Sequence, residues 1–188
     1  REFQIFAKPI GATCNLECRY CYYLRKSELY PQDEPLRMAD DLLEEYIRQH
    51  IAACPTSTVF FAWHGGEPTA LGVDYYRRIV ELQRKHLPPG RQAMNGIQTN
   101  GTLLDEAWCR FLAENRFYVG LSLDGPRELH DAYRVTKGGQ PTHQRVIGAL
   151  RLLQRHRVPT DTLCVVHDRN VGHPLEVYRY LREIGADY

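Results

Sequence analysis

The sequence predicts an α/β protein in which parallel strands alternate with helices. Short apolar runs alternate with longer segments of helical period, and chemically active motifs directly follow the apolar runs. The second, fourth and fifth apolar runs are continuous, which is typical of parallel strands buried on both faces. The five strands are expected at Phe3 to Ile10, Thr58 to Trp63, Met94 to Thr99, Phe117 to Leu123 and Asp161 to Val166.

Amphipathic helices are expected between these strands. One begins after Asp40 and carries apolar residues through Ile51, and another begins after Asp74, so both aspartates are expected to be N-caps. This alternation places the helices outside a parallel sheet. Further helices are expected at about Asp105 to Glu114, His143 to His156 and Pro174 to Ile184.

Two closures of the sheet are compatible with this pattern: an open doubly wound sheet and a barrel. A barrel of eight units needs roughly 250 residues, whereas the chain has 188. Five units and a sixth strand beginning at Asp187 do not complete one. No linker is visible, so we interpret residues 1–188 as one domain, either a fragment of a longer protein or a partial barrel that lacks its last unit.

The charge balance argues against nucleic acid or an anionic membrane as the partner. The chain has 24 basic and 23 acidic residues, a formal charge of +1, and so lacks a bulk basic field. No apolar run approaches the roughly 20 residues of a membrane-spanning helix, and the first residues do not have a signal-peptide pattern. We therefore expect a cytoplasmic protein, where cysteines serve as metal or catalytic thiols rather than in disulfides.

Three cysteines follow the first strand at close spacing: Cys14, Cys18 and Cys21. Three thiolates can hold a [4Fe–4S] cluster by three irons and leave the fourth iron open to a chelating substrate. A structural zinc would need a fourth ligand, and the nearest further ones, His50 and Cys54, lie in a predicted helix. The spacing predicts an open iron–sulfur cluster, with structural zinc or unliganded thiols as alternatives.

Polar motifs follow the next three strands as well. They are His64–Pro68 (HGGEP), Gln98–Gly101 (QTNG) and Leu121–Gly125 (LSLDG). Paired glycines let a backbone approach a ligand, although a simple strand-to-helix turn would also explain them. Because carboxyl ends of parallel strands share one edge, we expect all these motifs at one site. The connection from Asp124 to about Pro141 is long for such a fold, and long loops are usually functional or disordered.

The remaining cysteines, Cys54, Cys109 and Cys164, fall in predicted helices or strands and are expected to serve packing. Tyr22 and Tyr23 directly follow the cysteine motif. They are expected either to line a substrate cavity or to pack.

The pattern Cys-x-x-x-Cys-x-aromatic-Cys, with Tyr20 as the aromatic residue, resembles that of the radical S-adenosylmethionine (SAM) enzymes. The Gly-Gly-Glu-Pro element is similar to the one with which that family receives the methionine amino group. The resemblance implies that the Arg134 guanidinium grips the SAM carboxylate; the alternative is a solvated loop charge. The SAM-binding residues implied are Tyr20, Gly65, Gly66, Glu67, Asn100, Ser122 and Arg134.

Further motifs resemble the anaerobic sulfatase-maturating enzymes, which belong to the SPASM-type peptide-modifying enzymes. They lie at residues 7–13, 22–24, 64–68, 98–101, 122–125 and 130–134, so the similarity covers essentially the whole chain. It implies an N-terminal radical SAM domain with a partial (β/α)6-type parallel barrel. The implied activity is reductive cleavage of SAM and oxidation of a sulfatase cysteine or serine to Cα-formylglycine.

That family continues into a cysteine-rich domain with two auxiliary clusters and an aspartate base, so the catalytic base is expected beyond residue 188. Alone, this chain is expected to cleave SAM without producing formylglycine. The implied partners are a sulfatase peptide and an external electron donor such as flavodoxin or ferredoxin. The alternatives are another peptide-modifying maturase, for example a thioether-forming one, and a non-enzymatic iron–sulfur or metal-binding scaffold.

Overall fold

The strands form one parallel sheet whose order in space follows their order in the chain. The computed structural model describes residues 3–29 and 36–186, where the order is β1-β2-β3-β4-β5 and all neighbours are parallel. A doubly wound sheet reverses its order at a switch point, and a barrel does not. The order therefore favours the predicted partial barrel. The strands are β1 (Phe6–Ala7), β2 (Thr58–Trp63), β3 (Gln92–Thr99), β4 (Tyr118–Ser122) and β5 (Thr160–Leu163).

Helices follow the strands as the hydrophobic period predicts. The α-helices are α1 (Asp40–Ala53), α2 (Val73–His86), α3 (Glu106–Glu114), α4 (Arg127–Asp131), α5 (His143–Arg155) and α6 (Pro174–Glu183). Two short 3₁₀ helices, η1 (Lys26–Leu29) and η2 (Pro68–Leu71), complete the elements of the described residues. Neither α4 nor the 3₁₀ helices were predicted, because four or five residues are too few for a helical period to show.

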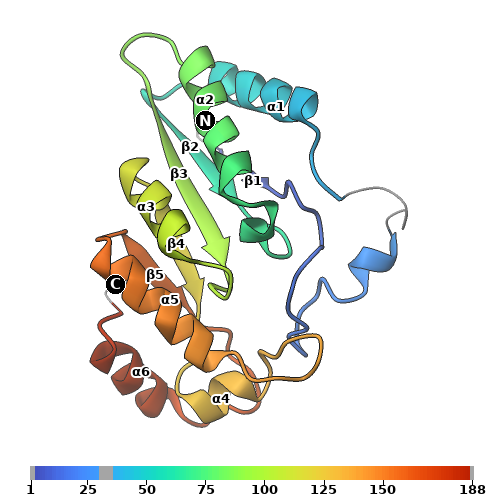
Figure 1. Cartoon of the computed structure of the whole chain (residues 1–188), viewed down its shortest axis with the longest axis vertical. Coiled ribbons are helices and arrows are strands. Elements are labelled where there is room, and N and C mark those ends of the chain that lie inside the picture. The colour runs from blue at the N-terminus through green and yellow to red at the C-terminus, as the bar shows by residue number, and fades with distance from the viewer. Residues whose placement is uncertain (1–2, 30–35, 187–188) are drawn as a thin grey trace.

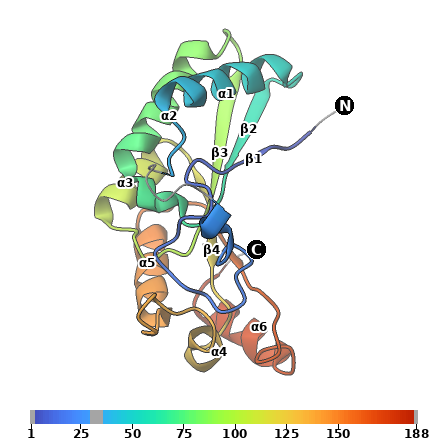
Figure 2. The same cartoon turned by 90° about the vertical axis from the view of Figure 1, so that its right-hand side faces the viewer.

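The two faces of the sheet have different surroundings. Helices α1, α2, α3 and α5 cover one face (Figures 1 and 2), and there Val59, Phe61 and Trp63 of β2 are fully buried. Successive strand residues point to opposite faces. The opposite, concave face lines a hollow of about 340 Å³, where Phe6 and Leu163 remain 50% and 45% exposed. The concave face is thus free to receive a ligand.

Two predicted strands are shorter than expected. The first comprises only Phe6–Ala7, because Pro9 has no N–H for a ladder and Gly11, with φ +58°, turns the chain. The fifth is Thr160–Leu163, and its residues are half-buried or exposed, so the prediction of burial on both faces is wrong there. It lies at the sheet edge and faces the concave hollow. The expected sixth strand, from Asp187, lies outside the described residues.

The predicted N-caps of the first two helices are wrong by one or two positions. Ala39 and Gly72 occupy the cap positions. The Asp40 and Asp74 carboxylates instead accept hydrogen bonds from arginines three residues away. Both acidic groups still lie in the first helical turn, where the helix dipole favours negative charge.

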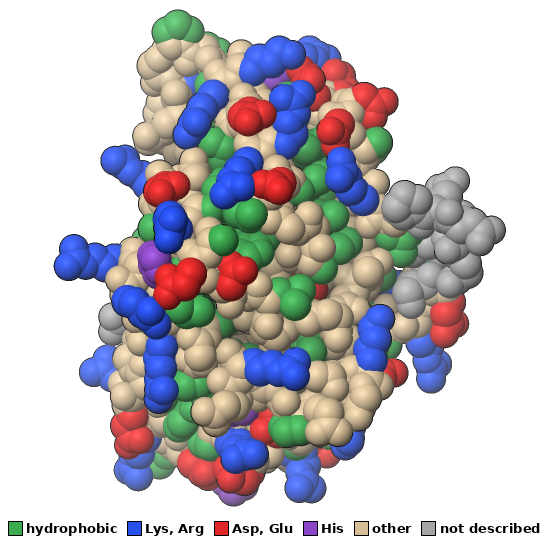
Figure 3. Space-filling view, in the orientation of Figure 1, with side chains coloured by type: hydrophobic (Ala, Val, Ile, Leu, Met, Phe, Trp, Pro, Cys, Tyr) green, Lys and Arg blue, Asp and Glu red, His purple; other side chains and the backbone are tan. Residues whose placement is uncertain are grey.

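Surface charge is mixed, as the composition indicates. Figure 3 shows Lys and Arg side chains interspersed with Asp and Glu over the face it presents. Within the described residues, the structure has no helix that is both long and apolar enough to cross a membrane.

Candidate functional site

The cysteine loop is bonded to a segment more than 100 residues later in the sequence, residues 133–136. The Glu17 N–H donates to the Val135 carbonyl at 2.9 Å and the Arg19 N–H donates to the Tyr133 carbonyl at 3.0 Å. Leu16 and Thr136 form an antiparallel bridge. Because the loop has no regular structure of its own, these backbone bonds fix its path beside the carboxyl ends of the strands.

The three motif cysteines form an unusual set of thiols. Cys18 is buried, and Cys14 and Cys21 are half-buried. Burial raises the pKa of Cys14, and it raises the pKa of Cys18 to about 11. Both thiols therefore stay neutral at pH 7 until a positive metal centre draws off the proton. Neither thiol is thus activated as a free nucleophile at this pH.

The donor set of the cysteine loop bears on the kind of metal site that it could hold. Three thiols come from the eight residues Cys14 to Cys21. A structural zinc takes four ligands, whereas three thiolates can hold a [4Fe–4S] cluster by three of its irons. The thiols of this loop therefore fit a cluster better than a structural zinc ion. Within residues 3–29 and 36–186, no three cysteine, histidine or carboxylate side chains are arranged to hold one metal ion.

Asn100, at the end of β3, contacts this loop directly. Its side-chain nitrogen Nδ2 lies 3.7 Å from Cys14 Sγ and 2.9 Å from Asn15 Oδ1. The same sulfur accepts from the Leu16 N–H at 3.4 Å. The β3 motif thus meets the cysteine motif, as the shared edge predicts.

The paired glycines are required by close contact with the loop before the cysteines. The Gly66 N–H donates to the Gly11 carbonyl at 2.9 Å, and a Cβ on Gly66 would lie 2.0 Å from the Thr13 carbonyl oxygen. Gly65 has φ +124°, a conformation that strains other residues. The close approach expected for a ligand is made here by the protein's own backbone.

Glu67 joins the ends of β2 and β3 and is fully buried. Its carboxylate accepts four hydrogen bonds, from the Thr69 N–H, the Thr69 and Thr99 hydroxyls, and the Asn100 N–H, at 2.5 to 2.9 Å. Burial raises its pKa, and the four donors act against this rise. All four donors come from the protein, so the carboxylate fixes two motifs relative to each other.

Arg134 and Tyr20 converge on Asp124, which follows β4. Arg134 Nε and Nη2 lie 2.9 and 3.1 Å from the two carboxylate oxygens, and the pair is almost completely buried. The Tyr20 hydroxyl donates to the same carboxylate at 2.5 Å, and the Val165 N–H at 2.9 Å. The guanidinium therefore forms a bidentate ion pair with a carboxylate of the protein itself. Its third nitrogen, Nη1, does not take part in this ion pair.

Ser122 lies on the same face of β4 as Tyr118 and Gly120, which line the concave hollow. Gln98 Nε2 donates to the Ser122 hydroxyl oxygen at 3.1 Å, which leaves the hydroxyl proton available to a ligand.

Tyr22 is 63% exposed and its ring centroid lies 4.1 Å from that of Tyr23. The tyrosine pair thus forms an aromatic surface beside the cysteine loop.

Sequence reasoning missed two residues of the site. Asp124 is part of a motif that was noted, but its fully buried carboxylate was not foreseen. His167 lies after β5, with Nε2 buried and 3.9 Å from Asp124 Oδ2, and its ring packs on Tyr20 and Tyr133. No sequence signal marks a histidine in a loop as part of a core network.

The other cysteines have structural surroundings. Cys109 is fully buried in α3, as predicted. Cys54 follows the end of α1, and Cys164 follows β5 instead of lying within it. None of the six cysteines, each within the described part of the chain, forms a disulfide.

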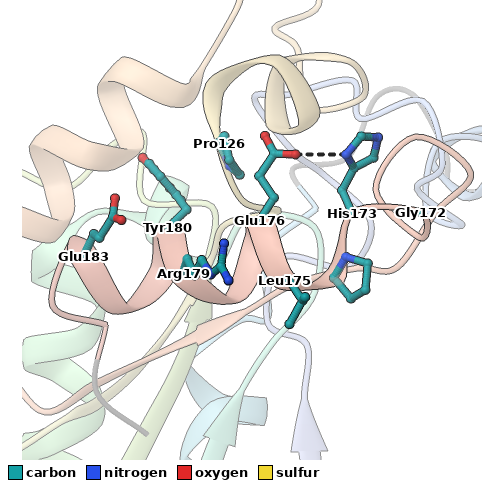
Figure 4. A pocket seen from close by; sticks show the side chains of 9 residues that line it. Pro126, Gly172, His173, Leu175, Glu176, Arg179, Tyr180 and Glu183 are labelled. Atoms are coloured by element: carbon teal, nitrogen blue, oxygen red, sulfur yellow. Dashed lines mark hydrogen bonds and ion pairs between the residues drawn. The ribbon is translucent and has the colours of Figure 1, made fainter.

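Another hollow lies apart from these motifs. It has a volume of about 720 Å³ and lies along α6, where His173 Nδ1 pairs with Glu176 at 2.9 Å (Figure 4). None of the motif residues described above lines it. The motif contacts therefore place the candidate site at the cysteine loop and the concave face.

A parallel α/β sheet whose strand order follows the chain, with three thiols beside its carboxyl edge, defines a partial-barrel domain of the α/β class. The chain belongs to the radical SAM superfamily, whose family model matches residues 9–181. It is 44% identical over 188 residues to a serine-type anaerobic sulfatase-maturating enzyme of Bacteroides thetaiotaomicron. It is 38% identical over 179 residues to a cysteine-type anaerobic sulfatase-maturating enzyme of Clostridium perfringens.

Solved structures agree with the fold. A structure described as native anSMEcpe with bound AdoMet and Cp18Cys peptide matches with a TM-score of 0.89 and 36% identity, covering 98% of this chain and 48% of that one. The two enzymes above are covered for 45% and 48% of their lengths, and this chain for 100% and 95%. The chain thus spans about half the length of the relatives it matches.

Proposed function

We propose that this chain is the radical SAM domain of an anaerobic sulfatase-maturating enzyme, which oxidises a cysteine or serine of a sulfatase to Cα-formylglycine. The observation that carries the proposal is the meeting of Cys14 with Asn100 at the carboxyl edge of the sheet. The 44% identity to a serine-type enzyme supports this assignment. Relatives of both types match, so the choice between cysteine and serine is left to experiment.

Cys14, Cys18 and Cys21 are proposed to hold a [4Fe–4S] cluster that binds SAM at its open iron. When bound and supplied with one electron by an external donor, the two groups would provide methionine and a 5′-deoxyadenosyl radical capable of hydrogen abstraction. The fit is supported by three thiols from one loop and by the two N–H groups directed at Cys14 Sγ. Those donors stabilise negative charge on a ligand sulfur.

The protein's own groups would orient SAM. Ser122 can donate its hydroxyl proton to the methionine carboxylate, and Arg134 Nη1 is proposed as a second donor to it. Tyr20 and the Gly65–Gly66 backbone are proposed to border the ligand. Glu67 and Asn100 are proposed to act by fixing this backbone, since their polar groups are bonded within the protein.

The remaining parts of the reaction require partners. A flavodoxin or ferredoxin is proposed as the electron donor, and a sulfatase peptide as the substrate. The base that completes the oxidation is proposed to lie outside residues 1–188. A reducing cytoplasm is proposed as the compartment, which suits a protein whose six cysteines form no disulfide.

The first test concerns the cluster. Anaerobic reconstitution followed by Mössbauer spectroscopy should give one [4Fe–4S] cluster per chain, and Cys14→Ala, Cys18→Ala or Cys21→Ala should each lose it. Cys164→Ala is the control and should keep it, because that thiol lies after β5 outside the motif. Zinc in the site, or a full cluster in any motif variant, would contradict the proposal.

The second test concerns the substrate. The reconstituted chain is mixed with SAM, dithionite and a sulfatase peptide deuterated at Cβ of its target cysteine or serine. Deuterium should appear in 5′-deoxyadenosine, while formylglycine should be absent from this chain alone. SAM cleavage without deuterium transfer from either peptide would refute sulfatase maturation, and a thioether product would favour the other maturase.

A further inference from the structure

Asn100 is directed at a cysteine sulfur by bonds that fix the orientation of its amide. Its oxygen Oδ1 accepts from the Thr102 N–H at 2.9 Å, and a backbone N–H can only donate. The other end of the amide, Nδ2, is therefore the end that faces Cys14. An asparagine flip would place two donors against each other and is excluded by this contact.

A closed ring of side chains supports this orientation. Asn100 Nδ2 donates to Asn15 Oδ1 at 2.9 Å, Asn15 Nδ2 donates to the Thr102 hydroxyl at 2.8 Å, and that hydroxyl donates to Asn100 Oδ1 at 2.7 Å. Asn100 is only 8% exposed. One Nδ2 proton is used in the ring, and the second is directed at Cys14 Sγ at 3.7 Å.

We propose that Asn100 is a positioning residue that tunes the cluster: its amide donates to Cys14 Sγ and raises the reduction potential of the iron–sulfur centre. This inference rests on the proposed function, because it requires the cysteines to hold a cluster. Cys14 Sγ then accepts from two donors: the Leu16 backbone N–H within the cysteine loop and the Asn100 side chain, which follows β3.

The direction of the effect follows from charge. One-electron reduction adds a negative charge to the cluster, part of which resides on the ligand sulfurs. An N–H donor to a sulfur stabilises the reduced form more than the oxidised form, and hydrogen bonds to sulfur are among the factors that set cluster potentials. Loss of the donor therefore makes reduction by an external donor less favourable.

The test measures the potential itself in the reconstituted chain, by dithionite titration monitored with electron paramagnetic resonance. In Asn100→Ala the donor is lost, and the equilibrium constant for one-electron reduction should fall about tenfold, as expected for a hydrogen bond to a charged group. A tenfold change corresponds to a potential about 59 mV more negative. The backbone bond from the Asn100 N–H to Glu67 does not depend on this side chain.

Asn100→Ser separates tuning from a purely structural role. A serine hydroxyl can still accept from the Thr102 N–H in a turn of the same kind, but it is too short to reach Cys14. Tuning predicts the same negative shift as in Asn100→Ala, whereas a role in bracing the turn predicts the wild-type potential. Asn115→Ala is the control: it removes an asparagine amide that bonds the Phe111 carbonyl and Arg84 at the end of α3, leaves both donors to Cys14, and should leave the potential unchanged.

The outcomes distinguish this inference from the function on which it rests. If the wild-type chain assembles no cluster, the proposed function fails. If it assembles one and Asn100→Ser keeps the wild-type potential, the tuning role is refuted and the function stands. A negative shift in Asn100→Ser, with the potential of Asn115→Ala unchanged, supports the tuning role.

Discussion

Replacing Asp124 with asparagine should destabilise this domain far more than its small change in volume suggests. The carboxylate oxygens accept from four donors: the Tyr20 hydroxyl, two Arg134 nitrogens and the Val165 N–H. Burial raises the pKa of Tyr20, so its hydroxyl keeps the proton that it donates. Asparagine offers one acceptor oxygen and one amino group. Whichever way its amide turns, the amino group faces donors.

The magnitude follows from the burial of the ion pair. Asp124 is completely buried and the Arg134 side chain is 8% exposed, so water cannot replace the lost charge. Removing one partner of a buried pair costs about 3–5 kcal/mol, because the other charge stays buried and uncompensated. Domains of this kind are stable by about 5–15 kcal/mol, so the loss is a large part of the total.

Urea denaturation followed by circular dichroism at pH 7 measures this loss in the free energy of unfolding. The matched control is Glu81→Gln, which breaks an exposed ion pair with Arg78 and should change stability by about 0.5 kcal/mol or less. A loss below about 1 kcal/mol for Asp124→Asn, the range of surface pairs, would refute the reasoning.

A double variant tests the same cause from the other side. Arg134→Leu removes the charge that Asp124→Asn leaves uncompensated, so the two losses should overlap. The double variant should be less destabilised than the sum of the single variants, with an interaction energy of about 0.5–3 kcal/mol. Simple additivity would show that the two residues stabilise the fold independently.

Two further predictions concern stability. His130 Nδ1 accepts from the Asp124 N–H, and burial lowers the pKa of this histidine from 6.5 to about 4. Between pH 6.5 and 4 the unfolded chain therefore binds more protons than the folded chain, so the free energy of unfolding should fall by roughly 3 kcal/mol as the pH is lowered through this range. His130→Gln should not show this loss. Equal pH slopes for the two proteins would contradict this. Gly66→Ala should lower the free energy of unfolding, measured by urea titration, by at least about 1–3 kcal/mol, because the new Cβ would clash with the Thr13 backbone. Its control is Gly148→Ala, in open space on α5, which should raise the free energy of unfolding by up to about 1 kcal/mol. Similar values for both variants would disprove the backbone clash.

Periodicity and motif position predicted the fold well because they depend on local sequence. Strands β2, β3 and β4 and all helices of nine or more residues lie where the apolar pattern places them. The order of the strands was not readable, since doubly wound sheets and barrels share the same alternation. The length of β1 also depends on a neighbour: only Phe6 and Ala7 pair with β2.

The site was predicted as a set of motifs but not as a set of contacts. That Cys14 and Asn100 would meet followed from the shared sheet edge, and the structure brings them together. That Arg134 would pair with Asp124 did not follow. Spacing along a chain places a side chain at an edge, but partners within a buried network are chosen by packing among residues distant in sequence.

The cysteine loop is synthesised before the segment that fixes its conformation. Its backbone pairs with Val135, Tyr133 and Thr136, and Tyr20 bonds Asp124 across 104 residues of sequence. During synthesis, which proceeds from the N-terminus, the cysteines emerge long before the segment that holds them. The ribosome must therefore release most of this domain before the loop can take its final shape. A group bound by the three thiols can therefore be enclosed only after residues 133–136 have emerged, and nascent chains that end before residue 133 should expose all three thiols.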